Sequence, residues 1–360
     1  MKILFAIKSL AISGGAERVF SEISSKLSLK YDVSVLSFDA KTDESFYKIN
    51  KEIKIIKTTE NLQGISIKNL NPIKKIIFLR GIISSHAIDT VIGFNFSIYF
   101  LLAIGLIGLP VKVICSEHST YEGFSKNFFS PILLSLISNL PIKFAVVSEH
   151  AFNTFPKKIQ KISKIIKNPI SVPFNEKLNF EDKNNTILSV GRLAEEKNHL
   201  DLLKSFKLIS SKIPNWKLKI IGSGPLESQI KSFIETNDLT NRVELIKETK
   251  SIELEYQMAK FLIVPSRYEG FGLVIAEALS CGLPVVLFEN GNSSNLIKNN
   301  FNGIVISNNS QQIENLSLEI EKLALNNDLI KELAKNCMKP KGHSGEKIIK
   351  DWEKLIFQDL

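Results

Sequence analysis

Two glutamates flank a glycine turn in the stretch SRYEGFGLVIAEALSCGLPVV, residues 266–286. Glu269 precedes the turn Gly270-Phe271-Gly272, and Glu277 follows it on a segment with helical spacing of apolar residues. A glycine turn lets the backbone approach a ligand closely, and its N–H groups can bind an anion. A buried carboxylate there needs a partner. The stretch therefore predicts a ligand site, although Glu277 fits equally well as a carboxylate that complements a helix dipole.

Two further glycine turns offer groups that can bind phosphate. Gly14 and Gly15 lie between an apolar run and a helical pattern, where free N–H groups and the helix dipole favour an anion. Gly191 ends another apolar run and is followed by Arg192 and Lys197, which can neutralise a diphosphate. Taken singly, each pattern is also consistent with an ordinary turn or with solvated surface charge.

The elements that must position these residues are strands alternating with helices. The strand-like runs are KILFAI, VSVLSF, DTVIGF, VKVICS and FAVVS in the first half and TILSVG, WKLKIIG, VELIK, KFLIVPS and PVVLF in the second. Such alternation is typical of βαβ units around parallel sheets. We therefore predict an α/β protein with two doubly wound sheets, each binding ligands at the carboxyl ends of its strands. Residues 157–167, KKIQKISKIIK, fit both an amphipathic helix and a strand, and we predict a strand for the second half.

The chain of 360 residues is long enough for two hydrophobic cores. A proline and a polar cluster without apolar period mark residues 171–185 as the linker. The predicted domains are residues 1–170 and residues 186–345, each with its own doubly wound sheet. Residues 346–360 are predicted as a helix that packs back on the first domain.

Composition excludes several classes of protein. The three cysteines are odd in number and show no C-x-x-C spacing, which argues against a disulfide framework or a zinc site and favours a reducing cytoplasm. The start, MKILFAIKSL, is interpreted as a first buried strand instead of a signal peptide. The longest apolar run, residues 98–109, is too short to span a bilayer and predicts a buried helix.

Positive charge is concentrated in one half of the chain. Residues 1–175 hold 22 Lys and Arg against 12 Asp and Glu, whereas residues 176–360 hold 24 against 25. This asymmetry predicts contact with an anionic membrane surface, although general solubility charge and core phenylalanines explain it equally well. The candidate segments are residues 71–87, with Lys74, Lys75 and Arg80, and residues 121–129, with Phe124, Lys126, Phe128 and Phe129.

The motifs SGGAERV, VGRLAEEKN and EGFGLVIAE followed by ALSCGLPVV occur in the order found in one known family. In this respect the sequence closely resembles the retaining glycosyltransferases of family four over nearly its whole length. The resemblance implies the GT-B fold, in which two Rossmann-like domains face each other across a cleft. The segment ICSEHSTYEG further resembles the bacterial branch of N-acetylgalactosamine transferases, which act on undecaprenyl-diphosphate-linked glycans.

The resemblance implies roles in binding a nucleotide sugar. Arg192 and Lys197 would grip the diphosphate and act in catalysis. Glu277 would accept hydrogen bonds from the ribose hydroxyls. The backbone from Gly270 through Phe271 and Gly272 to Leu273 would hold the sugar and the phosphates.

The remaining implied roles concern the donor sugar and the opposite domain. Glu269 would contact the donor sugar, and His118 would lie beside the donor sugar and the acceptor. The Gly14-Gly15 turn would close over the phosphates. The sequence departs from the family where many relatives have an acidic residue, because Asn295 occupies that position and is given no role.

These expectations together predict a retaining enzyme without a metal or other cofactor, since no Asp-x-Asp motif occurs and fixed cations can stabilise the leaving group. The predicted donor is a UDP-sugar, most simply UDP-N-acetylhexosamine, and the predicted acceptor is a polyprenyl-diphosphate-linked glycan. The enzyme would work at the cytoplasmic face of the membrane, with no nucleic acid partner. The alternatives are a nucleotide-sugar epimerase of the same fold and a non-catalytic subunit that binds nucleotide sugars.

Overall fold

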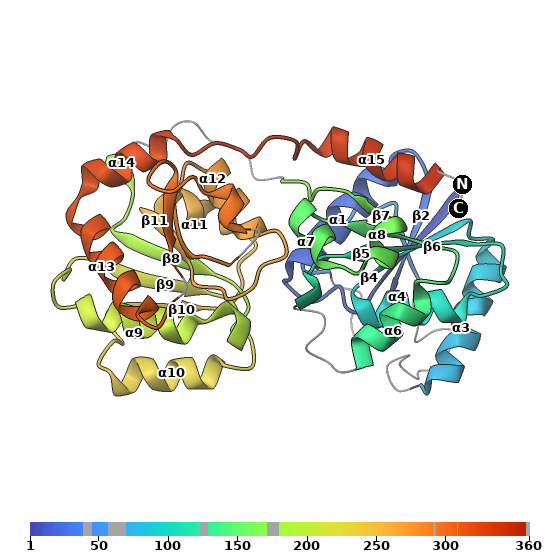
Figure 1. The fold of residues 1–360 in the computed structure, drawn as a ribbon, viewed down its shortest axis with the longest axis horizontal. Coiled ribbons are helices and arrows are strands. Elements are labelled where there is room, and N and C mark those ends of the chain that lie inside the picture. The colour runs from blue at the N-terminus through green and yellow to red at the C-terminus, as the bar shows by residue number, and fades with distance from the viewer. Residues whose placement is uncertain are drawn as a thin grey trace. The chain divides into compact units, whose positions relative to one another are not determined.

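The computed structural model describes residues 1–38, 45–56, 70–122, 129–170, 180–290, 293–307 and 309–357. Within these residues the chain forms two compact units (Figure 1). Unit 1 comprises Met1–Pro169 and Ser344–Leu360, and unit 2 comprises Ile170–His343. Most of the predicted linker, residues 171–179, lies outside the described residues.

Unit 1 is built on a seven-stranded parallel sheet with the order β3-β2-β1-β4-β5-β6-β7. The order reverses between β1 and β4, which is the point where doubly wound sheets bind ligands. The strands are β1 (Lys2–Ile7), β2 (Asp32–Ser37), β3 (Lys54–Ile56), β4 (Thr90–Phe94), β5 (Lys112–Glu117), β6 (Ile142–Val146) and β7 (Ser163–Ile165). The helices are α1 (Gly15–Leu27), α3 (Pro72–His86), α4 (Phe96–Gly105), α6 (Phe129–Ile137), α7 (Glu149–Thr154), α8 (Lys157–Lys161) and α15 (Gly345–Phe357).

Both faces of this sheet are covered, which explains why its strands are almost continuously apolar. Leu4 and Ala6 of β1 join one core cluster with residues of α3, α4 and α6. Phe5, between them, points to the other face and contacts Phe20 of α1, with ring centroids 5.6 Å apart. Successive side chains of a strand alternate in this way.

Unit 2 contains a six-stranded parallel sheet with the order β10-β9-β8-β11-β12-β13, which reverses between β8 and β11. The strands are β8 (Thr186–Val190), β9 (Lys217–Ile221), β10 (Val243–Ile246), β11 (Phe261–Val264), β12 (Val285–Phe288) and β13 (Gly303–Ile306). The helices are α9 (His199–Ile209), α10 (Glu227–Thr236), α11 (Ile252–Met258), α12 (Leu273–Ser280), α13 (Gln312–Leu325) and α14 (Asn327–Lys335), with 3₁₀ turns η2 (Phe180–Asp182), η3 (Glu195–Lys197) and η4 (Ser293–Leu296). One core cluster joins this sheet to α9, α10 and α13, and a second joins it to α11 and α12.

The final helix, α15, belongs to unit 1 although unit 2 precedes it in the chain. Its Glu353 accepts a hydrogen bond from Lys30 Nζ at 2.9 Å and one from the Tyr31 hydroxyl at 3.0 Å. Trp352 is buried and stacks on Phe94 of β4, with ring centroids 6.4 Å apart. The last helix thus completes the core of the first unit.

All ten predicted strand segments are strands, and the two sheets confirm the doubly wound α/β prediction. The second half of residues 157–167 forms β7, as favoured from the sequence. The apolar run at residues 98–109 lies largely in the short helix α4, which begins at Phe96. Among the described residues, no helix is long and apolar enough to cross a membrane.

Candidate active site

Lys197 and Glu269 meet at the carboxyl edge of the second sheet. Strands β8 and β11 are neighbours there, so the segments that follow them lie side by side. Lys197 ends the turn η3, and its Nζ donates to Glu269 Oε1 at 2.5 Å. The two side chains are only 24% and 14% exposed. Partial burial strengthens this ion pair compared with one in open solvent.

Arg192 lies on the same segment as Lys197 and is far more exposed. Its side chain is 65% exposed, and its guanidinium donates to Glu196 at 2.5 Å. Burial of Glu196 opposes its ionisation, but the hydrogen bond and charge of Arg192 outweigh burial, and the pKa of Glu196 is lowered. Both predicted phosphate-binding cations are therefore paired with carboxylates, which a diphosphate would have to replace.

Two glycines after β9 set the path of the segment that carries Arg192. A Cβ on Gly222 would lie 2.0 Å from the carbonyl oxygen of Gly191, and one on Gly224 would lie 2.5 Å from that of Leu193. The Leu193 N–H donates to the carbonyl of Ser223 at 2.8 Å. The sequence motif IIGSGPLE therefore supports the site through close backbone packing, a role that sequence analysis did not assign.

The turn before α12 has the geometry that its glycines predict. Gly272 adopts φ +79°, in the left-handed region, and a Cβ there would lie 2.9 Å from Cβ of Ser293. The helix begins at Leu273, and its first backbone hydrogen bonds run from the N–H groups of Ile275 and Ala276 to the Gly272 carbonyl at 3.0 and 3.1 Å, so the N–H groups of Leu273 and Val274 precede them. Phe271 is buried and stacks on His343, with ring centroids 4.7 Å apart.

Glu277 lies in the second turn of α12 and is 3% exposed. The hydroxyl of Tyr256, on α11, donates to Glu277 Oε2 at 2.9 Å. Because helix-dipole stabilisation fades beyond the first turn, the dipole does not explain why this carboxylate is buried. An ionised carboxylate only accepts hydrogen bonds, so a buried one is suited to receiving hydroxyl donors.

The Gly14-Gly15 turn opens α1, as the sequence predicts, and Gly14 is its N-cap. A Cβ on Gly14 would lie 2.0 Å from Oε2 of Glu17. The mostly buried Glu17 carboxylate therefore lies over this turn, where the sequence predicted a phosphate. A carboxylate at a helix N-terminus is stabilised by the same dipole and N–H groups, so a phosphate would have to displace it.

His118 follows β5 in unit 1. A hydrogen bond of 2.9 Å joins its Nε2 to Ser116 Oγ, and its ring stacks on Phe94 with centroids 5.2 Å apart. Burial lowers the pKa of His118 to about 4, so the ring is neutral at pH 7. A neutral imidazole can accept or donate a hydrogen bond but carries no charge to stabilise an anion.

Glu117 holds the backbone on which His118 lies, and sequence analysis did not single it out. Its buried carboxylate accepts from the N–H groups of His118 and Ser119 at 2.9 and 2.8 Å, and from the Ser119 hydroxyl at 2.6 Å. The Tyr99 hydroxyl donates to its other oxygen at 2.5 Å. The sequence signal was an acidic residue at the buried end of a strand, next to a candidate histidine.

The structure thus groups the predicted residues by unit. Arg192, Lys197, Glu269 and Glu277 belong to unit 2, as does the turn from Gly270 to Leu273. The Gly14-Gly15 turn and His118 belong to unit 1. Within the described residues, no group of three or more His, Cys, Asp or Glu side chains could hold a metal ion.

His199, the first residue of α9, makes the stability of the folded protein depend on pH. It is 2% exposed, and burial, assisted by the Lys197 charge, lowers its pKa to about 4. The unfolded chain binds a proton near pH 6.5 and the folded chain does not, so stability is lost as pH falls below 6.5. Between pH 7 and 5 we expect this residue to reduce the free energy of unfolding by about 2 kcal/mol. Denaturant titrations at both pH values check this, and H199N should show a correspondingly smaller loss.

Comparison with known proteins gives a family and a fold. Residues 173–339 match the family model "Glycosyl transferases group 1". An uncharacterized glycosyltransferase of Haemophilus influenzae is 28% identical, with 99% of each chain covered. A Campylobacter jejuni protein named "N-acetylgalactosamine-N,N'-diacetylbacillosaminyl-diphospho-undecaprenol 4-alpha-N-acetylgalactosaminyltransferase" is 25% identical, with 93% of each chain covered.

The same architecture occurs in solved glycosyltransferase structures. The crystal structure of HepE from Anabaena in complex with UDP-glucose has a TM-score of 0.77 at 17% identity, with 98% of each chain covered. At this identity the likeness concerns the fold alone. The fold and the family match agree: the chain has the GT-B architecture of two Rossmann-like domains, and its residues 173–339 are similar to the glycosyl transferases group 1 family.

Proposed function

We propose that the chain is a retaining, metal-independent glycosyltransferase that moves an N-acetylhexosamine from a UDP-sugar to a polyprenyl-diphosphate-linked glycan. The observation that carries this proposal is the Lys197–Glu269 pair at the point where the second sheet reverses its order. A cation and a carboxylate at this edge, next to the glycine turn of α12, suit a ligand that has both phosphates and sugar hydroxyls.

The reaction breaks the bond between the anomeric carbon and the diphosphate. The electron pair goes to the leaving phosphate oxygen, and the acceptor oxygen forms its new bond to the anomeric carbon on the same face. The acceptor proton passes to the leaving phosphate. Arg192 and Lys197 stabilise the negative charge that develops on the diphosphate. Such electrostatic stabilisation by fixed donors is usually the largest single contribution to the rate enhancement of an enzyme.

The choice of donor and acceptor rests on similarity. HepE was crystallised with UDP-glucose, and the Campylobacter relative is named for transfer to a diphospho-undecaprenol glycan. The buried Glu277 carboxylate suits the two hydroxyls of a ribose. These observations support a UDP-sugar and a lipid-linked acceptor for this chain.

A donor screen tests the proposal. The purified protein is incubated with each of several UDP-sugars and a crude extract of lipid-linked glycans, and products are weighed by mass spectrometry. The expected result is one glycan heavier by a single N-acetylhexosamine. Conversion of a UDP-sugar without acceptor would instead identify an epimerase, and nucleotide-sugar binding without any product would identify a non-catalytic subunit.

Transfer should persist in excess EDTA. The proposed leaving-group stabilisers are the fixed cations Arg192 and Lys197, so chelation removes nothing that the reaction needs. Initial rates with and without EDTA should agree within about twofold, whereas loss of activity restored by magnesium or manganese would contradict a metal-independent mechanism.

The proposed membrane contact is an apolar face of unit 1 that we call the α3-α4-α6 face. Helix α3 packs on α4, and α4 packs on α6. Exposed apolar side chains on this face are Ile73, Ile77, Ile104, Ile107, Ile132 and Leu136. Lys74 is exposed and Lys75 half-exposed between them, so the face combines apolar side chains with positive charge. This combination suits insertion at an anionic lipid interface.

One residue of the predicted membrane segments differs from expectation. Arg80 is not available for headgroups, because its guanidinium donates to the carbonyls of Gly105 and Ile107 at 3.0 and 2.9 Å and so closes the end of α4. In residues 121–129, Phe124, Lys126, Phe128 and the side chain of Phe129 lie outside the described residues.

The intact protein should co-sediment with vesicles that contain anionic lipid and should dissociate as salt rises. The double variant Ile73→Glu/Ile77→Glu should bind at least about tenfold less, because each glutamate adds a charge that the interface repels. A similarly exposed residue of unit 2, Leu254, provides the control variant Leu254→Glu. Equal binding by the double variant and the control would show that the α3-α4-α6 face is not the contact.

A further inference from the structure

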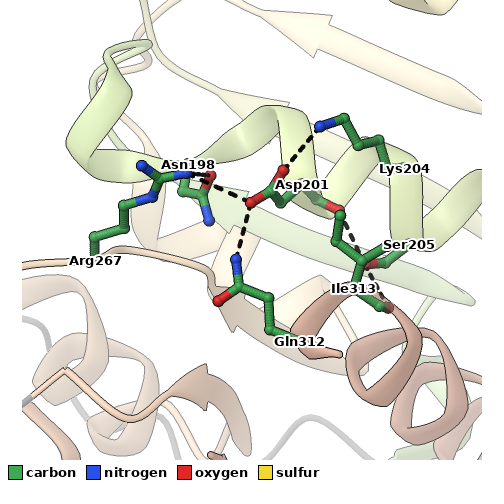
Figure 2. Close-up of polar contacts among 7 residues, drawn as sticks. All are labelled: Asn198, Asp201, Lys204, Ser205, Arg267, Gln312 and Ile313. Carbon is green, nitrogen blue, oxygen red and sulfur yellow. Dashed lines mark hydrogen bonds and ion pairs between the residues drawn. The ribbon is translucent and has the colours of Figure 1, made fainter. Parts of the chain in front are cut away.

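A polar cluster connects two segments of unit 2, the one between β8 and α9 that carries Lys197 and the one between β11 and α12 that carries Glu269. Figure 2 shows Asp201 of α9 at its centre, with Arg267 on one side, Gln312 of α13 below and Lys204 above. Asp201 Oδ2 lies 3.7 Å from Arg267 Nη2 and accepts from Gln312 Nε2 at 3.0 Å. Its other oxygen accepts from Lys204 at 3.1 Å. The cluster therefore joins α9, α13 and the segment after β11.

Asp201 is a fixed anchor in this cluster. Its side chain is 10% exposed, whereas that of Arg267 is 55% exposed. Burial opposes ionisation of Asp201, but the hydrogen bond from Lys204 and the surrounding positive charge outweigh it and lower its pKa. The carboxylate therefore stays charged at neutral pH and can hold the more exposed guanidinium in place.

Arg267 lies in the segment after β11 and contacts the segment after β8. Its guanidinium donates to Asn198 Oδ1 at 3.4 Å, and its backbone N–H donates to the Glu196 carbonyl at 2.8 Å. Asn198 directly follows Lys197 and adopts φ +57°, a left-handed conformation that most residues disfavour. Glu269 lies two residues after Arg267. One side chain thus connects the neighbour of Lys197 to the neighbourhood of Glu269.

We propose that Asp201 and Arg267 form a positioning pair that holds the Lys197 and Glu269 segments in register for binding the donor diphosphate and sugar. The proposal rests on the proposed function and adds two residues to its machinery. Neither residue touches the donor; they act by fixing the backbone on either side of the Lys197–Glu269 ion pair. Catalytic groups need positions fixed to a fraction of an ångström, which second-layer contacts supply.

A purely structural role is the competing explanation, since Asp201 also joins α9 to α13. The two helices provide a matched control at their other end, where Lys212, just after α9, pairs with Glu321 of α13 at 2.7 Å. Loss of that ion pair also removes a polar contact between α9 and α13, but at a point far from the segments of Lys197 and Glu269. The variant Glu321→Gln therefore separates helix bridging from positioning of the site.

The test measures UDP affinity by calorimetry for the wild type, Asp201→Asn, Arg267→Gln, the double variant and Glu321→Gln. We expect Kd for UDP to rise about tenfold in each single variant and no further in the double variant, because the two residues act as one unit. Glu321→Gln should bind as the wild type does. Melting temperatures of all variants should agree within about 2 °C. Additive effects, or an equal effect of Glu321→Gln, would overturn the proposal.

Two further measurements separate positioning of the Lys197 and Glu269 segments from a general structural role of Asp201 and Arg267. In a Lys197→Ala background, Arg267→Gln should have little further effect on Kd, because its influence acts through the segment of Lys197. Amide hydrogen exchange of the ligand-free protein should show faster exchange at residues 191–198 and 265–272 in Asp201→Asn and unchanged exchange elsewhere. Unchanged exchange in these segments would overturn the positioning pair. Altered exchange in a protein that binds no UDP would keep the pair and refute the proposed donor.

Discussion

Replacement of Lys197 or Arg192 by alanine is expected to lower the turnover of sugar transfer by roughly two to three orders of magnitude, the scale for losing one charge-stabilising donor. Lys197 is mostly buried against Glu269, so its loss would leave that carboxylate without this cation at the proposed diphosphate site. Arg192 is more exposed, and in the proposed function its planar guanidinium contacts two phosphate oxygens. Arg192→Lys should therefore recover only part of the lost rate.

Single-turnover rates with saturating donor measure this effect without interference from product release. Lys212→Ala is the matched control, because it removes a lysine that also pairs with a glutamate of unit 2 but lies beyond α9. The control should retain nearly full turnover. Near-normal turnover in a folded Arg192→Ala/Lys197→Ala double variant would remove the basis for assigning leaving-group stabilisation to these residues.

Replacement of Glu277 by alanine is expected to raise KM for the donor by at least about a hundredfold, since two charge-assisted hydrogen bonds to ribose hydroxyls are lost at about 1.5–3 kcal/mol each. The Glu277 side chain is only 3% exposed, so ribose hydroxyls bound there are shielded from water that could replace the lost hydrogen bonds. Steady-state kinetics with the donor identified by the screen provide the measurement.

A modified donor makes the assignment of Glu277 specific. The wild type should use a 2′-deoxy donor at least about tenfold less well than the natural one, because one hydrogen bond to the carboxylate is missing. Glu277→Ala should treat the two donors alike. Tyr256→Phe removes only the hydroxyl that donates to Glu277 and should keep the preference for ribose. Undiminished preference in Glu277→Ala would place ribose recognition elsewhere.

Local sequence pattern was sufficient to locate most of the fold. Apolar runs of strand length predicted ten strands, because a strand buried on both faces must be nearly continuously apolar. The local sequence pattern did not predict β3, which has three residues, or β13, which begins with a glycine. The three residues of β3 are too few to give a periodic signal, and the glycine at the start of β13 is untypical of a strand, so pairing with β2 and β12 defines these two strands instead.

The candidate site divides in the same way. Glycine positions such as Gly272, the helix that carries Glu277 and the strand before His118 follow from residues close in sequence, because local backbone conformation and periodicity determine them. The motifs that resemble the family identified Arg192, Lys197 and Glu269 as a set. The sequence alone therefore determined the fold class and the main candidate residues.

Only the tertiary structure decided which side chains meet. Lys197 and Glu269 are 72 residues apart and pair because β8 and β11 are neighbours in the sheet. Gln312 reaches Asp201 across 111 residues because α13 packs on α9. The Glu17 carboxylate occupies the turn where the sequence predicted a phosphate. Such contacts depend on strand order and side-chain packing between distant segments, and neither is encoded in the spacing of residues along one segment.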